Sequence, residues 1–325
     1  MAPKAPYILL GAGGGIVPNS SPEEMASLLK HIQTLPVPIY GIDTAGVYPM
    51  PDPGLSERVL GKAGIGETPL ILDTKILVGQ TVDSSNGGAL SKVNLQKSMD
   101  KSLEQLKVKK VRVIYAHQPD TQTSVAEAVE GFGKILKDGK AESWGVSNFS
   151  AAQVEEYAAE AKKQGVPLPT LYQGQYNAIF RSPEEDLFPV LKKHGIKFYA
   201  YSPTAGGFLS TKVAASDGAE LPSRFQAGHR AADRMNAKYN KPKTRAALVS
   251  LHKVAEAQGI DLLGASLRWL AYHSPLGEGD GIILGASKVE QIDHSDGEIA
   301  KGPLPEDIVA EYEKLWAVAK GEEGS

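Results

Sequence analysis

The sequence contains no cysteine among its 325 residues. This absence excludes disulfides, thiolate metal sites and a cysteine nucleophile, and it fits a reducing compartment. The net charge is also small, -3 at pH 7, so composition gives no electrostatic reason to expect a nucleic acid or an anionic membrane as partner. Hydrophobic residues make up 42% of the chain and charged residues 22%, which is enough apolar material for a sizeable core.

Long apolar runs are missing too. No stretch reaches the roughly 18 residues that a membrane-spanning helix needs. The first apolar run, Tyr7–Leu10, is too short for the core of a signal peptide. The histidines and acids show no clustered spacing that would predict a metal site. These absences predict a cytoplasmic protein with no membrane, nucleic-acid or metal partner.

Short apolar or β-branched runs alternate with amphipathic stretches of helical periodicity. The expected strands are Tyr7–Leu10, Val37–Ile42, Pro69–Leu77, Lys110–His117, Ala141–Ser147, Thr170–Asn177, Ile196–Ser202 and Gly281–Leu284. The expected helices begin near Ser21 and after Ser287, and cover Leu55–Lys62, Lys92–Leu106, Ser124–Lys137, Ser150–Gly165, Pro183–His194, Thr244–Gln258, Leu263–Tyr272 and Glu306–Ala319. Repeated βα units imply parallel strands with right-handed crossovers. They predict one domain, residues 1–325, folded as a closed (β/α)8 TIM barrel; the alternative is an open doubly wound sheet.

A glycine-rich run, Gly11 to Gly15, follows the first expected strand. A dinucleotide-binding G-x-G-x-x-G turn would need a third glycine where Ile16 stands, and a helix starting at once. Here Val17 to Ser20 intervene before the helix that we expect from Ser21. We therefore interpret the run as a flexible first βα loop at a barrel mouth.

Polar residues close the expected strands. Asp43 ends the second strand with Tyr48 in the loop beyond it, Lys75 lies near the end of the third, and His117 ends the fourth. Later strand ends carry Ser147, Asn148, Gln173, Gln175, Asn177, Tyr201, Ser202, Gly285 and Ser287. Each has an ordinary interpretation alone, such as a surface charge or a helix cap. In a barrel, however, all strand ends face one rim, which is where active sites form.

The first four of these residues suit proton donation to a carbonyl oxygen. A tyrosine is a poor acid near neutral pH, but the ammonium of Lys75 would lower the pKa of Tyr48. Asp43 would hold Lys75 charged and in position, and His117 would hydrogen-bond the substrate oxygen or share the proton. Reduction of a carbonyl also needs a hydride, which implies a nicotinamide cofactor.

A long stretch of weak periodicity follows the seventh expected strand and is rich in cations. These cations are Arg224, His229, Arg230, Arg234, Lys238, Lys241, Lys243 and Arg245, against the single acid Asp233. A loop of this kind at the barrel mouth could hold a polyphosphate, or it could be a solvated basic surface. Arg224 is the strongest candidate because Pro222 and Phe225 give it the least solvent-like neighbours.

Several motifs resemble the aldo-keto reductase superfamily over nearly the whole chain. They are Ile42-Asp43-Thr44-Ala45 with Tyr48, Asp73-Thr74-Lys75, His117, Gly145 to Phe149, and Tyr172-Gln173. Further stretches are similar to the aflatoxin-aldehyde reductase branch: Gln175 to Ala178, Phe198 to Pro203 with Gly206-Gly207, Arg224-Phe225, Leu267 to Trp269 with Tyr272 to Ser274, and Ile283 to Gly285.

The resemblance implies an NADPH-dependent reductase of aldehydes and some ketones, with its active site at the C-terminal face of the barrel. Tyr48 would be the general acid, Lys75 and Asp43 its tuning pair, and His117 the partner that orients the substrate. Ser147, Asn148 and Gln173 match positions that bind the cofactor carboxamide, and Tyr201 matches the position that stacks on the nicotinamide. The loop from Ser202 to Lys212, with Pro203, Gly206 and Leu209, would cover the pyrophosphate, and Gly285, Arg224, Ser287, Gln291 and Ser295 would lie near the adenosine end.

Two departures from the superfamily pattern concern the cofactor and the substrate, and a third is the loop from Gly11 to Asn19, which has unusually small residues. The last motif reads Gln291-Ile292-Asp293-His294-Ser295 where the family often ends in asparagine, so NADH is not excluded. The tail after Ala319 has no arginine of the kind that meets acidic substrates in this branch.

The alternative function is a cofactor-sensing regulatory subunit of the same fold with little turnover. The expected partner is a small carbonyl substrate, and the expected state is a monomer or homodimer.

Overall fold

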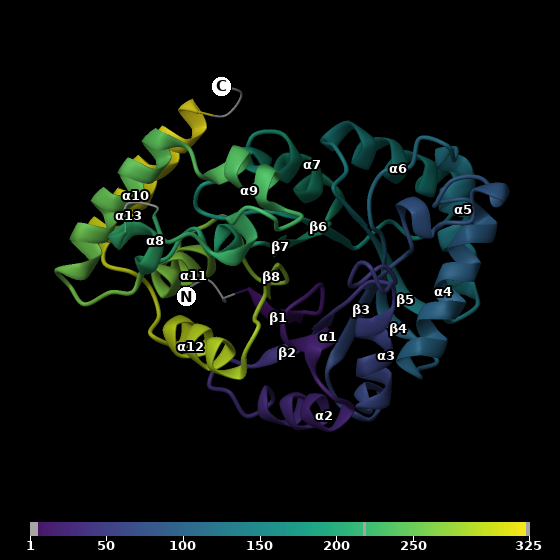
Figure 1. Ribbon diagram of the computed structural model, residues 1–325. Coiled ribbons are helices and arrows are strands. Elements are labelled where there is room, and N and C mark those ends of the chain that lie inside the picture. The colour runs from purple at the N-terminus through teal and green to yellow at the C-terminus, as the bar shows by residue number, and fades with distance from the viewer. Residues whose placement is uncertain (1–5, 217–218, 323–325) are drawn as a thin grey trace.

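A computed structural model describes residues 6–216 and 219–322 (Figure 1). The expectations about a leader and about the tail depend partly on residues 1–5 and 323–325, which lie outside this range. The strands are β1 Tyr7–Gly11, β2 Ile39–Asp43, β3 Ile71–Lys75, β4 Val111–Ala116, β5 Ala141–Ser147, β6 Leu171–Gln175, β7 Lys197–Tyr201 and β8 Gly281–Leu284. The helices are α1 Ile16–Asn19, α2 Pro22–His31, α3 Leu55–Lys62, α4 Lys92–Leu106, α5 Val125–Lys137, α6 Ala151–Gln164, α7 Leu187–His194, α8 Thr211–Ala215, α9 Ala232–Tyr239, α10 Pro242–Glu256, α11 Leu262–Tyr272, α12 Val289–Ala300 and α13 Glu306–Gly321.

The strands form a closed parallel barrel in sequence order. Each strand pairs with the next, and β8 pairs with β1 through registers such as Leu9 opposite Ile283. This last pairing confirms the predicted (β/α)8 barrel, because an open doubly wound sheet leaves two free edges. Asp43 at the end of β2 lies opposite Asp73, two residues before Lys75 at the end of β3.

Helix boundaries follow the capping signals of the sequence. Ser21 accepts a hydrogen bond from the backbone of Glu24 in a capping box before α2, and Ser150 opens α6 in the same way. At the other end of α6, Gly165 has a φ of 69°, a left-handed conformation that glycine adopts without strain. These signals explain why the predicted bounds of most helices are accurate.

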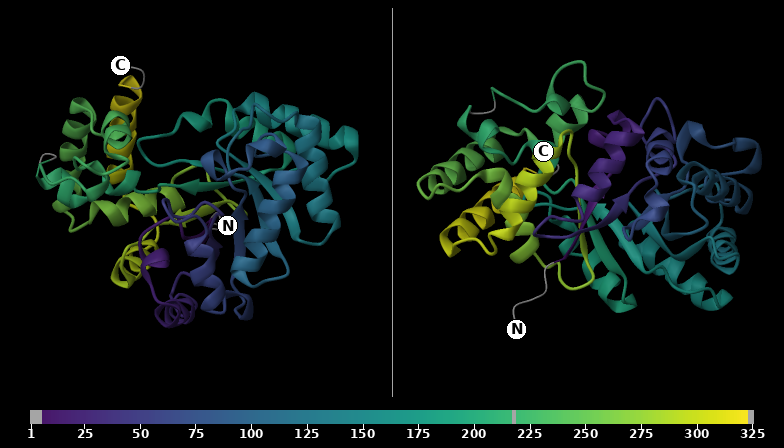
Figure 2. Two further views of the ribbon diagram at one scale, coloured as in Figure 1. Left: turned by 45° about the vertical axis from the view of Figure 1, so that its right-hand side comes forward. Right: turned by 90° about the horizontal axis from the view of Figure 1, so that it is seen from below.

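The apolar residues divide into two clusters. A large cluster fills the space between the barrel and the helices around it, and Figure 2 shows these helices on the outside of the sheet. A smaller cluster inside the barrel contains Leu9, Val113, Tyr115, Leu171, Tyr199 and Ile283. The interior is therefore filled with side chains, as in other barrels of this class.

Two segments contain helices that the sequence pattern did not predict. The first βα loop includes α1, whose Ile16 and Val17 are buried and which packs against α3. The stretch after β7 includes α8, the short 3-10 turn η6 (Ser223–Phe225) and α9. These elements have one or two turns each, too few for a helical period to be visible in the sequence.

The segment after β7 lies over the ends of neighbouring strands (Figure 1). The Tyr239 hydroxyl, at the end of α9, contacts the side-chain amides of Gln175, the last residue of β6, and of Asn177 just beyond it. Farther along the rim, Arg230 donates a hydrogen bond of 3.3 Å to the carbonyl oxygen of Met50, in the loop after β2. This segment therefore spans part of the barrel mouth. Within the residues that the structure describes, no helix has the length and apolarity to cross a bilayer.

Candidate active site

A buried ion pair joins the ends of β2 and β3. The ammonium of Lys75 donates to both carboxylate oxygens of Asp43, at 2.8 and 2.7 Å, and to the carbonyl oxygen of Thr44 at 2.8 Å. Lys75 is completely buried and Asp43 nearly so. The three N–H groups of the ammonium thus have three acceptors, which fixes its position and compensates for its removal from water.

Tyr48 and His117 complete this cluster. The Lys75 ammonium lies 5.0 Å from the centroid of the Tyr48 ring, and the Tyr48 and His117 rings meet edge to face at 5.6 Å. The carbonyl of Tyr48 accepts backbone hydrogen bonds from Gly54 and Ser56, at the start of α3. The structure therefore brings together all four residues that the sequence predicts for proton donation.

The electrostatics of Tyr48 differ from the sequence-based expectation of a lowered pKa. Burial raises the pKa of Tyr48, and although the charge of Lys75 opposes this effect, the carboxylate of Asp43 adds to it, so that the pKa stays above its ordinary value. Burial also lowers the pKa of Lys75, but Asp43 and Tyr48 outweigh it and the pKa is raised. The expectation included the Asp43–Lys75 pair but not the burial of the phenol, which has the largest effect on the pKa of Tyr48.

His117 is a neutral imidazole in this environment. Burial, together with the nearby Lys75 charge, lowers the pKa of His117 to about 3, against a smaller opposite effect of a backbone contact with Ile76. Its Nδ1 atom is buried and has no hydrogen-bond partner within the described chain. Of the two predicted roles, hydrogen bonding to a substrate oxygen therefore fits this residue better than sharing a proton as imidazolium.

Asn148 links several predicted residues at the rim. Its amide donates to the carbonyl oxygen of His117 at 3.1 Å and to the hydroxyl of Ser147 at 3.0 Å. Its carbonyl oxygen accepts a 2.8 Å hydrogen bond from the Tyr201 hydroxyl. Asn148 and Ser202 both have positive φ, 63° and 57°, which is uncommon outside glycine and is often found at functional sites.

Gln173 makes a contact that the sequence does not predict. Its Nε2 donates a 2.7 Å hydrogen bond to Asp43 Oδ1, so that this carboxylate is held by Gln173 as well as by Lys75. Both Gln173 and Asp43 are buried. The side chain expected to bind a cofactor carboxamide therefore also supports the ion pair beneath Tyr48.

The other predicted cofactor residues lie on the rim with different degrees of accessibility. After β7, Pro203 and Leu209 are buried while Gly206 is partly exposed with a φ of 69°. Lys212 forms an exposed ion pair with Glu220 at 3.0 Å. The buried side chain of Leu209 packs in the core, so only its backbone could face a ligand.

The residues predicted for the adenosine end form two separate groups. Ser287 donates through its backbone and its hydroxyl to the amide oxygen of Gln291, at 2.7 and 3.0 Å, beside the exposed Gly285. Ser295 is partly buried farther along α12. Arg224 is exposed on η6 next to the buried Phe225. Among the described residues, Arg224 has no hydrogen bond or ion pair with the group at the start of α12.

Sequence reasoning missed three contributors to the site. Gly13 approaches the Tyr48 ring so closely that a Cβ atom there would lie 3.3 Å from it. The Thr44 carbonyl holds Lys75, and the buried Glu57 of α3 accepts a 2.6 Å hydrogen bond from Thr74, beside Lys75. The glycine-rich run around Gly13 and the pair Ser56-Glu57 are signals that the sequence does contain. The Thr44 carbonyl has no such signal, because a main-chain acceptor is present in every residue.

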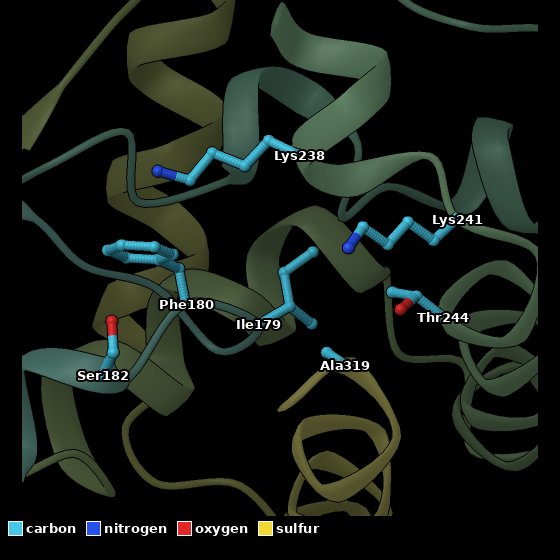
Figure 3. A pocket seen from close by; sticks show the side chains of 7 residues that line it. All are labelled: Ile179, Phe180, Ser182, Lys238, Lys241, Thr244 and Ala319. Atoms are coloured by element: carbon cyan, nitrogen blue, oxygen red, sulfur yellow. The ribbon is translucent and has the colours of Figure 1, made fainter. Parts of the chain in front are cut away.

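Two cavities lie apart from these residues. One of about 260 Å³ is lined by Ile179, Phe180, Ser182, Lys238, Lys241, Thr244 and Ala319 (Figure 3). Its cations already have partners: Lys238 lies 3.7 Å from the centroid of the Phe180 ring, and Lys241 donates to the carbonyl of Glu322. The other, of about 800 Å³, is lined by residues at the start of β3 and β4. Across the described residues, no group of three or more His, Asp or Glu could hold a metal ion.

Comparison with known proteins agrees with this arrangement. The sequence pattern of the Aldo/keto reductase family matches residues 11–317. The chain belongs to the Aldo/keto reductase family. The resemblance inferred from the strand-end motifs is thereby confirmed. Membership in this family supports an oxidoreductase that acts on carbonyl groups, and aldo-keto reductases use nicotinamide cofactors.

Individual relatives cover most of the chain. It is 34% identical to the oxidoreductase sirO of Leptosphaeria maculans, over 98% of this chain and 96% of that protein. It is 32% identical to the human aflatoxin B1 aldehyde reductase member 2, over 85% of this chain and 77% of that protein. It is also 31% identical to a putative voltage-gated potassium channel subunit beta of Schizosaccharomyces pombe, over 77% and 72%.

Proposed function

We propose that this aldo-keto reductase is an NADPH-dependent reductase of aldehydes and ketones, with Tyr48 as general acid. The observation that carries the proposal is the buried Lys75 ammonium, held by Asp43 and Thr44 at 5.0 Å from the Tyr48 ring centroid. Burying an ion pair in this geometry is expensive. A charge placed beneath a phenol at the barrel mouth supports a catalytic role.

The rim residues fit a nicotinamide cofactor. Tyr201 stands at the rim with its hydroxyl on Asn148, and the exposed Gly285 leaves open space where a Cβ would lie. We propose that Ser147, Asn148 and Gln173 bind the carboxamide and that Tyr201 stacks on the ring. The segment from Ser202 to Lys212 would cover the pyrophosphate, and Arg224, Ser287, Gln291 and Ser295 would contact the adenosine end. When bound, the cofactor supplies the hydride.

The chain's own residues would supply the proton. Because the pKa of Tyr48 is raised, its hydroxyl stays protonated at neutral pH, which is the form that an acid needs. As negative charge develops on the substrate oxygen, Tyr48 donates its proton and the nearby Lys75 ammonium stabilises the phenolate. The neutral His117 would donate a hydrogen bond to the same oxygen and orient it.

The preference for NADPH rests on the cations near the adenosine end. Arg224 is exposed and could bind a 2′-phosphate with its guanidinium. The unusual Asp293 pairs with His31, and His294 contacts Asp261. Asp293 and His294, both within the motif that departs from the family pattern, thus each contact a neighbouring element.

A second candidate function is a cofactor-sensing regulatory subunit. The observation that favours it is the similarity to a protein named as a putative potassium channel subunit beta. Such a protein would keep the cluster of Asp43, Tyr48, Lys75 and His117 and act through a partner. It would bind NADPH and show negligible turnover with a panel of aldehydes.

Binding followed by turnover tests these alternatives. NADPH and NADH would each be titrated while the fluorescence of the purified protein is followed, and a panel of aldehydes and ketones would then be assayed with the preferred nucleotide. We expect the protein to bind NADPH more tightly than NADH, and to oxidise NADPH only when a carbonyl substrate is present. Failure of both nucleotides to bind below millimolar concentration would contradict the proposal. Its cytoplasmic location, its oligomeric state and its single-domain organisation remain predictions.

A further inference from the structure

We propose that Glu57 is a positioning residue that sets the separation between the Tyr48 phenol and the Lys75 ammonium. The inference rests on the proposed reductase function and adds a residue to the machinery of the same site. Among the described residues, Glu57 forms no hydrogen bond with either group. Its effect would therefore pass through the elements that carry them.

The first turn of α3 fixes the backbone of the proposed acid. The carbonyl oxygen of Tyr48 accepts hydrogen bonds from the backbone N–H groups of Gly54 at 3.1 Å and of Ser56 at 3.2 Å. The Ser56 hydroxyl donates a 2.7 Å hydrogen bond to the Ala12 carbonyl, in the loop whose Gly13 meets the Tyr48 ring. The position of the phenol therefore depends on where the start of α3 lies.

Glu57 ties this turn to the strand that carries Lys75. Its Oε1 accepts a 2.6 Å hydrogen bond from the hydroxyl of Thr74, the residue just before Lys75 in β3. Because side chains alternate along a strand, Thr74 faces α3 while Lys75 faces the barrel interior, where it meets Asp43. This hydrogen bond thus connects the turn that holds Tyr48 with the strand position next to the ammonium.

The burial of Glu57 argues for a role beyond packing. Both Glu57 and Thr74 are completely buried. The second carboxyl oxygen, Oε2, is also buried and has no hydrogen-bond partner within residues 6–216 and 219–322. An apolar side chain would join α3 to β3 without the cost of burying a carboxyl group. A hydrogen bond, however, is directional, so that it holds the helix and the strand at one separation.

Glu57 does not need a negative charge for this role. Burial raises its pKa above the ordinary value. The hydroxyls of Thr74 and of Ser102, on the neighbouring α4, oppose this rise. The charges of Lys75 and Lys101 add to that opposition without cancelling the effect of burial. One carboxyl oxygen can accept the Thr74 hydrogen bond in either protonation state, and so can the oxygen of an amide, which makes Glu57→Gln the conservative variant.

Four variants and one control test the inference with a simple aldehyde, 4-nitrobenzaldehyde. Glu57→Met and Thr74→Val each remove the hydrogen bond with little change in side-chain size, the double variant removes both partners, and Glu57→Gln keeps the acceptor. The control Thr244→Val removes another buried hydrogen bond from a threonine to a glutamate, 2.7 Å from Thr244 to Glu322, between α10 and the end of α13. For each protein we would measure kcat, KM, the pH dependence of kcat, the dissociation constant of NADPH and the free energy of unfolding in urea.

We expect kcat to fall about tenfold in Glu57→Met and in Thr74→Val, with little change in KM or in NADPH binding. The double variant should lose no more than either single one, because both break the same hydrogen bond. The limb of the pH profile in which kcat falls as Tyr48 loses its proton should move to higher pH, because a displaced ammonium lowers the pKa of the phenol less. Glu57→Gln and Thr244→Val should both keep the wild-type kcat and pH profile.

A loss of stability with unchanged kcat and pH profile would make Glu57 an anchor of the fold alone and would overturn the inference. A loss of kcat in Glu57→Gln as large as in Glu57→Met would overturn it in favour of a role for the carboxyl proton or charge. If Glu57→Met does not fold, Thr74→Val gives the same comparison. A wild-type protein that oxidises no NADPH with any aldehyde would contradict the reductase function, whereas wild-type turnover with unaffected variants would contradict this inference alone.

Discussion

Lys75 donates hydrogen bonds to Asp43 and to the carbonyl oxygen of Thr44, and its ammonium lies 5.0 Å from the centroid of the Tyr48 ring. Both the charge of Lys75 and its hydrogen-bonding contact with the phenol lower the pKa of Tyr48. Burial of the phenol outweighs this effect and Asp43 adds to the effect of burial, so that the pKa of Tyr48 is raised. The arrangement favours a protonated phenol in the resting protein and a stabilised phenolate once the proton has left.

At the scale of single residues, the sequence was informative where a side chain ends a strand. Asp43, Lys75 and His117 could be predicted together because parallel strands of a barrel end at one rim. The Thr44 carbonyl could not be predicted, since a main-chain acceptor has no residue type of its own. The direction of the Tyr48 pKa shift also depends on burial and on two opposing charges, and a strand-end pattern does not give their balance.

The low pKa of His117 predicts a pH dependence of stability. Below pH 6.5 the unfolded chain binds a proton at this residue, whereas the folded protein binds it only near pH 3. The free energy of unfolding should then fall as the pH is lowered, by up to about 1.4 kcal/mol per pH unit from this residue. His117→Asn should lack this contribution, which urea unfolding between pH 7 and pH 4.5 would measure.

The exposed His229 offers the control. His229→Asn should give a stability profile parallel to that of the wild-type protein. If the profile of His117→Asn were also parallel, His117 would not be buried as a neutral group.

At the scale of elements, the first βα loop illustrates a feature whose role depends on tertiary contacts. Two hydrogen bonds hold its backbone. The Ser56 hydroxyl donates a 2.7 Å hydrogen bond to the Ala12 carbonyl, and the Ile16 N–H donates a 2.8 Å hydrogen bond to the Ala286 carbonyl. Between these contacts Gly13 lies against the Tyr48 ring. The sequence indicated a mobile loop, but it could not show which glycine meets the phenol.

Gly13→Ala is therefore expected to disturb catalysis. The added Cβ would lie 3.3 Å from the Tyr48 ring, so that the ring must shift by a few tenths of an ångström. Because a small misplacement of a catalytic group is costly, we expect kcat for a simple aldehyde to fall on the order of tenfold. Steady-state kinetics on the purified variant would measure it.

Gly14→Ala is the matched control for this variant. A Cβ at Gly14 meets no atom within 4 Å, and both substitutions restrict the unfolded chain equally. We expect kcat to be unchanged in Gly14→Ala. Equal kcat values for the two variants would show that the loop does not position Tyr48.

The segment between β7 and α10 is the element that the sequence described least well. Its helices α8 and α9 bury few residues, such as Val213 and Met235, so that no hydrophobic period develops. Its position over the rim depends on single contacts, from Arg230 to Met50 and from Tyr239 to Gln175. Such contacts between distant positions are not encoded in local pattern.

At the scale of the whole molecule, the proposed catalytic residues lie at the rim of the barrel, and an ion pair that we expect to stabilise the fold lies deeper inside it. Beneath the Lys75 layer, Arg112 of β4 forms a two-pronged ion pair with the buried Asp73 of β3, including a 2.9 Å hydrogen bond from Nε. Arg112 also donates to the Tyr199 hydroxyl at 3.1 Å. Alternation and strand count predicted the barrel itself, but not this interior pair.

Removing the arginine should destabilise the whole barrel. Arg112→Met would leave the carboxylate of Asp73 buried without its partner, which we expect to lower the free energy of unfolding by roughly 3–5 kcal/mol. Burial already raises the pKa of Asp73 against the charge of Arg112, so the loss should be smaller at pH 5.5 than at pH 7.5. Urea unfolding at the two pH values would measure both effects.

The neighbouring Lys110 provides a control of the same charge. Its ion pair with Glu142 spans 2.7 Å between largely exposed side chains, so that Lys110→Met should cost at most about 1 kcal/mol. Similar losses for the two variants would contradict a stabilising role for the interior pair.

The most direct test of the central claim is the turnover of Tyr48→Phe with a simple aldehyde and NADPH. Loss of the proton donor should lower kcat by about 10²- to 10⁴-fold, while the dissociation constant of NADPH stays near that of the wild-type protein. Tyr40→Phe, which removes the hydroxyl of a tyrosine that is 44% exposed on β2, should keep the wild-type kcat. A Tyr48→Phe variant with undiminished kcat would contradict the assignment of Tyr48 as the general acid.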